Sequence, residues 1–493
     1  MTGNYYQMNP MLSMVPAMDE RSAFAKAIEF VGAGKYMWED PMEERRIKMM
    51  YHKPDTTFMP KGVLMFVEDF RAATPDRKLH LAWMFNVYAQ QPLSRQEIYI
   101  DAVTGKVLLA NSLIKHTAAT GRTKYSSFVA FQTSDIGTTF ELYDSTRGSG
   151  IHTLNMNNGS SYGAATEYTS VTNTWPLAAA DTIALDAHWA AEIVYDYWNT
   201  VQGRLSYDNL DGILLQYVHY QSGFNNAFWD GTEMTYGDGT GCGSGFTPLA
   251  SLDVTGHEIG HGVCQYTANL VYARESGAMN ESFSDCWGAT IEAWADPHEI
   301  DAVSKVTWSI GEEIKCGNPL RRMDFPKLKS DPDTYGGTYW VNQVGCVPSG
   351  GNDECGVHTN SGVMNKWYYL VVQGGSGTND SSHAYSVTGI GFTQGADILY
   401  QTELALSSTA DYNLMRTTSI ATASTLYGPC SQAVITVTKA WYAVGVGPDY
   451  VPYPANITGV NNICVGGTST LSDATPGGTW SSSFPLIATI SSG

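Results

Sequence analysis

Two histidines and one glutamate in the middle of the chain have the types and the spacing needed to bind a metal ion and activate water. His257 and His261 are four residues apart, so on a helix both imidazoles project from one face and can share one metal ion. Glu258 follows the first histidine directly, where its carboxylate can reach a water molecule on that metal. Zinc takes such nitrogen ligands in a tetrahedral site, and a catalytic site leaves one position open.

A second motif supplies the carboxylate that such a site still needs. Residues 280–285 have the sequence Asn-Glu-Ser-Phe-Ser-Asp. A distant carboxylate on another helix is the usual third ligand of a catalytic zinc with two histidines, and Glu281 is the candidate. Asp285 follows Glu281 by about one helical turn and could accept the other ring N–H of a zinc-bound histidine. The alternative, a chance His-Glu-x-x-His sequence, is weakened by this second motif.

The motifs together resemble a known enzyme family. Residues 257–292 resemble the zinc-binding core of the thermolysin family of secreted metalloendopeptidases. Residues 225–229 (Asn-Asn-Ala-Phe-Trp) and 356–362 (Gly-Val-His-Thr-Asn-Ser-Gly) resemble two other stretches of that family, in the same order and at compatible spacings. The resemblance runs from about residue 125 to residue 447. It implies an α+β fold whose catalytic unit has a β-rich first lobe and a helical second lobe.

The resemblance also implies roles for particular residues. Glu258 would be the general base, and Tyr272 and His358 would stabilise the oxyanion that develops on the substrate. Asp353, five residues before His358, would orient that histidine. The residues that would bind the substrate backbone are Asn226, the carbonyl of Ala227, and Arg321.

The same resemblance predicts how the peptide would lie. Residues 224–238 would form an edge strand that pairs with the bound peptide by strand addition. An apolar pocket would hold the residue after the scissile bond, and burial there gains roughly 25 cal/mol per Å2 of apolar surface, which favours Leu, Phe or Ile. The residues aligned with this pocket are Leu249, Val254, Ile310, Ile314 and Leu320.

Three carboxylates match a calcium site of the family. They are Asp253, Glu292 and Glu312. The chain has Thr307 and Ser309 where the family pattern has acidic residues. Ca2+ needs six to eight oxygens, and its affinity follows the number of charged ligands. We therefore expect one Ca2+ ion rather than two; the alternative is a hydrogen-bonded cluster of acids.

The first 118 residues differ in charge from the rest. They carry 14 Lys+Arg and 13 Asp+Glu, whereas the remainder carries 14 and 35. Residues 22–30 have helical spacing, and residues 62–67 and 79–88 have the composition of strands, so a small α+β unit is expected. It resembles the propeptide of the family, a folding chaperone and temporary inhibitor, and could lie against an acidic cleft. The alternative is an accessory β domain.

The predicted domain boundaries follow from these observations. Residues 1–118 would be the propeptide, 119–252 the β-rich lobe, and 253–447 the helical lobe, with a processing linker at 115–122. Residues 448–493 would be a linker and a truncated immunoglobulin-like segment, because a whole module needs about seven strands and ~100 residues. A bare linker is the alternative for this last segment.

Two lone histidines lie on elements that the pattern predicts. Helical spacing is found at residues 182–200, which include His188, and a strand is expected at residues 217–220, which include His219. We expect both histidines to be structural.

Composition excludes some classes of protein. The chain is 43% apolar and 15% charged, so it can build sizeable cores, and its net charge of −20 argues against nucleic acid as a partner. The sequence has no run of 18 apolar residues, so no membrane-spanning helix is predicted. Residues 1–6 show no signal peptide. A cytosolic protein is one explanation, but we expect a secreted monomer whose sequence here is a fragment or incomplete. Eight cysteines permit disulfides; Cys346 and Cys355 are expected to pair, and most others cannot be paired from sequence.

The hypothesis is therefore a secreted zinc endopeptidase made as a zymogen, with proteins or peptides as substrates. One rival is a non-catalytic homologue that binds peptide or glycan, but it would need to have lost a ligand or the base. Another is a zinc aminopeptidase, which would need an acidic group for the substrate α-amine. The edge motif at Asn226 and Ala227 favours internal cleavage.

Overall fold

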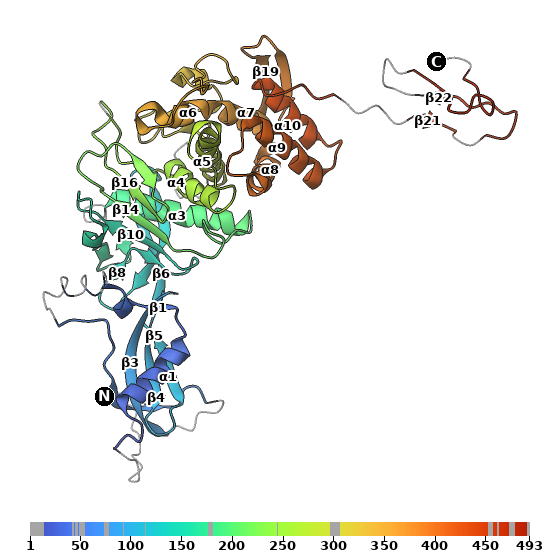
Figure 1. The fold of residues 1–493 in the computed structure, drawn as a ribbon. Coiled ribbons are helices and arrows are strands. Elements are labelled where there is room, and N and C mark those ends of the chain that lie inside the picture. The colour runs from blue at the N-terminus through green and yellow to red at the C-terminus, as the bar shows by residue number, and fades with distance from the viewer. Residues whose placement is uncertain are drawn as a thin grey trace.

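The computed structural model describes residues 14–41, 44, 48, 55–72, 78–91, 93–113, 115–175, 181–243, 245–295, 306–451, 457–460, 463–472 and 479–490. Residues 1–6, and residues 452–454 of the expected C-terminal linker, lie outside this part. Figure 1 shows an N-terminal unit, a β-rich middle part, a helical part, and a C-terminal tail that projects away from them.

In the described part of the N-terminal unit, a helix packs on an antiparallel sheet. Helix α1 (Glu20–Val31) begins at Asp19, whose side chain accepts from the Ser22 N–H, and ends at Gly32 in the left-handed conformation. Its small side chains pack on the sheet, whose order is β1-β3-β4-β5 with β2 paired to β3. The strands are β1 (Lys35–Tyr36), β2 (Val63–Glu68), β3 (Leu79–Gln91), β4 (Leu93–Asp101) and β5 (Val107–Ser112). The helix and strands expected from the sequence are confirmed.

The middle part contains two sheets that contact helix α3 (Thr182–Thr200). One has the order β12-β8-β7-β6-β13, and the other the order β11-β10-β14-β16-β15 with β9 paired to β10. Its strands are β6 (Lys115–Arg122), β7 (Phe128–Asp135), β8 (Phe140–Glu141), β9 (Tyr143–Asp144), β10 (Ile151–Asn155), β11 (Thr166–Glu167), β12 (Thr169–Ser170), β13 (Thr174–Trp175), β14 (Leu214–Val218), β15 (Ala227–Trp229) and β16 (Glu233–Tyr236). The edge strand expected at residues 224–238 is instead two antiparallel strands: β15 lies at the edge of the sheet, and β16 lies between β15 and β14.

The expected processing linker is instead a strand. Residues 115–122 form β6, which pairs along its whole length with β7 and also contacts β13. Ala119 and Gly121 point inward, and a Cβ at Gly121 would come within 2.6 Å of Leu185 on α3. Small and polar residues made this segment look like a linker, although they suit a strand packed closely on a helix. The expected boundary at residue 118 falls inside this strand.

The helical part places the two metal-motif helices side by side. Helix α4 (Leu252–Gln265) packs along α5 (Arg274–Ala295). A Cβ at Gly256 would lie 3.1 Å from Gly288, and one at Gly260 would lie 3.0 Å from Ser284, so glycine permits this close approach. The other helices are α6 (Asp353–Asn360), α7 (Gly362–Gln373), α8 (Gly391–Ala405), α9 (Tyr412–Tyr427) and α10 (Gln432–Ala443), with the strand pairs β17 (Ser309–Ile310) and β18 (Arg321–Arg322), and β19 (Gly374–Thr378) and β20 (Ala384–Thr388).

One hydrophobic core extends through both catalytic parts. Four tryptophans on four helices, Trp198, Trp287, Trp367 and Trp441, are fully buried in it. This continuous core gives the helices that bear the metal motif a rigid support. Among the described residues, no helix is long and apolar enough to cross a membrane.

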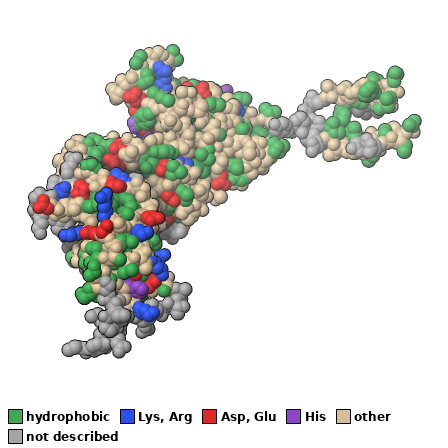
Figure 2. Space-filling model, turned by 60° about the horizontal axis from the view of Figure 1, so that its bottom comes forward, with side chains coloured by type: hydrophobic (Ala, Val, Ile, Leu, Met, Phe, Trp, Pro, Cys, Tyr) green, Lys and Arg blue, Asp and Glu red, His purple; other side chains and the backbone are tan. Residues whose placement is uncertain are grey.

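The tail beyond residue 447 has little regular structure where the structure describes it. It has one strand pair, β21 (Thr458–Gly459) with β22 (Leu471–Ser472). Hydrophobic side chains such as Val465 and Leu486 are fully exposed there. Figure 2 shows hydrophobic side chains on the surface of the tail. The immunoglobulin-like module stays a prediction.

Candidate active site

A cleft of about 890 Å3 lies between the β-rich and helical parts. Strand β15 and helix α4 contribute to its lining, as do α5, β18 and the segment that carries His358. Every predicted zinc ligand and catalytic residue lines it: His257, Glu258, His261, Tyr272, Glu281 and His358.

The three predicted zinc ligands converge in this cleft. On α4 the Nε2 atoms of His257 and His261 lie 3.0 Å apart. The Glu281 carboxylate on α5 lies 3.6 Å from the first Nε2 and 3.5 Å from the second. Ligands bound to zinc at 2.0–2.1 Å in a tetrahedron would be about 3.3 Å apart. In the described part of the chain, the buried Oε2 of Glu281 accepts no hydrogen bond, so the donor set fits a divalent metal ion.

Hydrogen bonds orient both imidazoles toward the shared site. His257 Nδ1 lies 2.8 Å from Asp285 Oδ1, as predicted. His261 Nδ1 lies 2.7 Å from the side-chain oxygen of Asn280. Both Nε2 atoms are thereby directed at Glu281. Asn280 was missed as a partner of His261, although its position one residue before Glu281 was a usable signal.

Burial controls the charges of the site. Burial, with the Glu281 charge nearby, raises the pKa of Glu258 to about 7, although His257 opposes the shift. Burial and the neighbouring His257 lower the pKa of His261 to about 4, which favours the neutral imidazole that a metal requires. Burial would also raise the pKa of Glu281, but the nearby histidines lower it to about 2.

Two polar side chains lie beside the metal ligands and open to the cleft. The Tyr272 hydroxyl donates to Glu281 and lies 3.2 Å from His358 Nε2. On the other side of its ring, His358 Nδ1 hydrogen-bonds to Asp353, which also accepts from the His358 backbone N–H at 3.0 Å. Tyr272 is partly exposed, at 41%, and His358 is exposed. They can therefore reach a ligand in the cleft.

The predicted substrate-binding residues line the same cleft. Asn226 and Ala227 lie at the edge strand β15, and Arg321 lies on β18. Arg321 donates from Nε and Nη2 to Asp285, each at 2.6 Å, so its guanidinium is fixed beside the metal ligands. Its neighbour Arg322 instead pairs with Asp324 and is more exposed.

Comparison with known proteins decides the family. A model of the thermolysin metallopeptidase catalytic domain matches residues 118–265, and one of the thermolysin metallopeptidase alpha-helical domain matches residues 268–446. The chain belongs to the thermolysin metallopeptidase family. It is 34% identical over 445 residues to bacillolysin of Brevibacillus brevis, covering 89% of this chain and 74% of that protein. It is 38% identical over 396 residues to thermolysin of Bacillus sp. (strain EA1), covering 74% of this chain and 66% of that protein.

A solved structure is also similar. It is a precursor of protealysin, a metalloproteinase from Serratia proteamaculans, with a TM-score of 0.47 and 26% identity over 60% of this chain and 87% of that one. The family models and the relatives show that this chain is a metallo-endopeptidase. It has a β-rich and a helical catalytic domain.

The five residues predicted for the apolar pocket all line the thermolysin-like cleft. Phe246 joins them and was missed. Its loop is held by Asn225, whose side-chain oxygen accepts from the backbone N–H groups of Phe246 and Thr240 at 3.0 Å each. Lys315 lies over the Phe246 ring at 4.1 Å. This loop has no helical or strand periodicity, so the sequence carried little signal for it.

The predicted calcium ligands need one correction. The carboxylates that meet within 4.8 Å are those of Asp253, Glu292 and Glu313, rather than Glu312. Residues 311–317 form a turn, so successive side chains point in different directions. The Glu312 side chain accepts from the Val306 N–H at 3.2 Å.

The N-terminal unit does not lie in the cleft. All residues that line the cleft fall within 226–358, and none comes from the described residues before β6. Figure 1 shows the unit beyond the β-rich part, away from the helices. The connection between β5, which ends at Ser112, and β6, which begins at Lys115, is short. The N-terminal unit therefore lies next to the sheet that contains β6. The expectation that this unit could lie against the cleft is therefore wrong.

Proposed function

We propose that this chain is a zinc-dependent endopeptidase in which His257, His261 and Glu281 hold the metal. The observation that carries the proposal is the convergence of these three ligand atoms, with Glu258 beside them, in one cleft of a thermolysin-like fold. A bound zinc ion would act as a Lewis acid and lower the pKa of its water to about 7.

Glu258 is the proposed general base. Its carboxylate would take a proton from the attacking water and then give that proton to the amine that leaves. A pKa of about 7, caused first by burial, suits a group that must both accept and return a proton near neutral pH.

Tyr272 and His358 are the proposed donors to the carbonyl oxygen of the scissile bond. Burial and the Glu281 charge hold the pKa of Tyr272 well above its usual value, so its hydroxyl keeps the proton that it would donate. The Asp353 carboxylate occupies His358 Nδ1 and leaves Nε2 directed at the cleft. Both donors would be placed where negative charge develops.

The substrate would lie along the edge strand. Asn226 and the Ala227 carbonyl would hydrogen-bond the peptide backbone there. Arg321 uses Nε and Nη2 for Asp285, which leaves Nη1 for a substrate carbonyl. The apolar pocket would favour Leu, Phe or Ile after the scissile bond.

Other parts of the proposal concern maturation. The N-terminal unit before β6 would serve as a propeptide, and the chain from β6 to residue 447 as the mature catalytic unit of a secreted monomer. One calcium ion would bind at Asp253, Glu292 and Glu313, because one oxygen of each carboxylate lies within 4.8 Å of the other two and Ca2+ prefers oxygen ligands.

The test uses one peptide with an internal leucine, in unmodified and N-acetylated forms. Enzyme stripped of metal should be inactive, and one equivalent of zinc should restore cleavage of both forms at the same internal bond. No cleavage after zinc is restored would indicate a non-catalytic protein. Cleavage of only the unmodified form would indicate an aminopeptidase.

A further inference from the structure

The backbone just before His358 has an unusual conformation. The four residues from Asp353 to Gly356 have φ of 55°, 48°, 71° and 84°, so they form a left-handed turn before the right-handed turns of α6 and α7. For L-residues this conformation brings Cβ close to the following carbonyl oxygen and is unfavourable. The turn brings the Asp353 side chain back to the ring and backbone N–H of His358.

Two neighbouring residues in this turn differ in how well they suit it. Gly356 has no Cβ, and one there would approach Val341 to 2.6 Å. Cys355 is fully buried and adopts φ of 71° without that freedom. A glycine would adopt this conformation readily. The cysteine therefore needs an interaction that holds it there.

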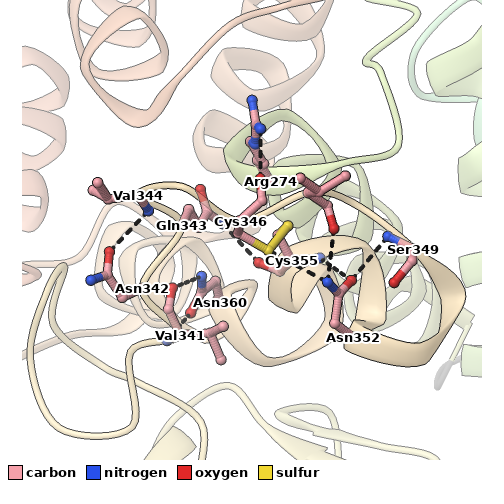
Figure 3. The surroundings of a disulfide bond; sticks show 11 residues. Arg274, Val341, Asn342, Gln343, Val344, Cys346, Ser349, Asn352, Cys355 and Asn360 are labelled. Carbon is pink, nitrogen blue, oxygen red and sulfur yellow. Dashed lines mark hydrogen bonds between the residues drawn. A yellow bond between two sulfur atoms is a disulfide. The ribbon is translucent and has the colours of Figure 1, made fainter.

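A disulfide bond supplies that interaction. Cys355 is bonded to Cys346, nine residues earlier. Figure 3 shows the polar side chains around the bridge: Asn352 accepts from the Cys355 N–H at 3.2 Å, and Gln343 donates to the Cys355 carbonyl at 3.2 Å. Arg274, at the start of α5, donates to the Cys346 carbonyl at 2.7 Å. The bridge thus ties the left-handed turn to the helix that carries Glu281.

We propose that the Cys346–Cys355 disulfide positions His358 by holding the left-handed turn that sets Asp353 against it. The proposal rests on the role of His358 proposed above. The cysteines touch no substrate, so they are positioning residues. Misplacement of a catalytic group by about 1 Å can cost ~10²-fold in rate. A chain in which this bridge has not formed would therefore bind substrate but turn it over slowly.

The matched pair of variants is C346S/C355A and C346S/C355G. Both lack the bridge, but only glycine can adopt the left-handed conformation without steric cost. We expect C346S/C355A to lose about tenfold or more in kcat with little change in KM. C346S/C355G should stay within about threefold of wild type. Bound zinc and the melting temperature, measured on the same samples, confirm that each variant is folded.

The His358→Ala change, alone and combined with C346S/C355A, separates this proposal from the one on which it rests. H358A should lose about 10²-fold in kcat, and removing the bridge in that background should cost no further rate. Full activity of H358A would refute the role of His358 itself. With H358A impaired, three results would overturn the disulfide proposal: full activity of C346S/C355A, equal losses in the alanine and glycine variants, or the same loss with and without His358.

Discussion

Asp285 and Arg321 form a buried ion pair, with two hydrogen bonds of 2.6 Å from the guanidinium to the carboxylate. The same carboxylate lies 2.8 Å from Nδ1 of His257. Burial would raise the pKa of Asp285, but Arg321 and His257 hold it well below its usual value. One carboxylate therefore orients a proposed metal ligand and a proposed substrate-binding residue.

The change Asp285→Asn should weaken both the metal site and the fold. Loss of the charge should lower zinc affinity about 10–100-fold. It should also destabilise the protein by about 3 kcal/mol, since the largely buried Arg321 loses its closest counter-ion and keeps only Glu281, at 3.8 Å. Competition with a chromophoric chelator and denaturant unfolding measure the two effects. Asp324→Asn is the control, because its pair with Arg322 is half-exposed and should be worth less than ~1 kcal/mol. Wild-type zinc affinity in the Asp285→Asn protein would contradict the account.

The proposed calcium site is tested by two adjacent glutamates. Calcium should raise the melting temperature of wild type, with about 2.7 kcal/mol of stabilisation at 100 times the dissociation constant. Glu313→Gln should abolish most of this effect, whereas Glu312→Gln should keep it, because only Glu313 joins Asp253 and Glu292. Melting at fixed zinc across a calcium titration gives the comparison. This ligand set would be refuted if Glu312→Gln lost the calcium-dependent rise in melting temperature while Glu313→Gln kept it. Two bound calcium ions per chain would also refute it.

His219 should make stability depend on pH. It lies between two carboxylates, with Nε2 2.5 Å from Asp181 and Nδ1 2.7 Å from Asp238. Burial alone would lower the pKa of His219, but the two carboxylates raise it to about 10. Since the folded pKa exceeds the unfolded value of about 6.5, the stabilisation is complete below pH ~6.5 and is lost as pH rises toward 10.

The corresponding variant is His219→Gln. It should cost about 2 kcal/mol of unfolding free energy at pH 6 and much less at pH 10.5. Urea unfolding at both pH values measures the difference. A cost that does not change with pH would show that His219 is not charged in the folded protein.

Cleavage specificity should follow the apolar pocket. A peptide library should give Leu, Phe or Ile as the main residues after the scissile bond, because Leu249, Ile310 and Leu320 line the cleft with other apolar side chains. Sequencing of cleavage products measures the preference. A profile dominated by Asp, Lys or Gly would show that these residues do not form the pocket.

The sequence predicted those parts of the molecule that local periodicity controls. Helix α3 has the bounds 182–200 expected from its apolar spacing. The four-residue spacing of His257 and His261 places both on one face of α4, and the same spacing aligns Glu281 with Asp285 on α5. The Cys346–Cys355 bond was also predictable, because the two cysteines bracket a short loop.

The errors and gaps arise where long-range packing decides. Strand β6 is recognisable only from its pairing with β7 and its contact with α3. The choice between Glu312 and Glu313 depends on the direction of side chains in an irregular turn. The bond between Cys242 and Cys316 joins residues 74 apart in sequence, which no local pattern indicates.

The change Glu258→Gln tests the central claim most directly, when zinc content and turnover are measured on the same preparation. Because Glu258 is proposed as base and not as ligand, the Glu258→Gln protein should keep one zinc per chain and lose ~10²–10⁴-fold in kcat. Glu281→Gln, measured in parallel, should lose zinc. A Glu258→Gln protein that keeps zinc and more than about a tenth of wild-type activity, far above the loss expected for a general base, would contradict the account.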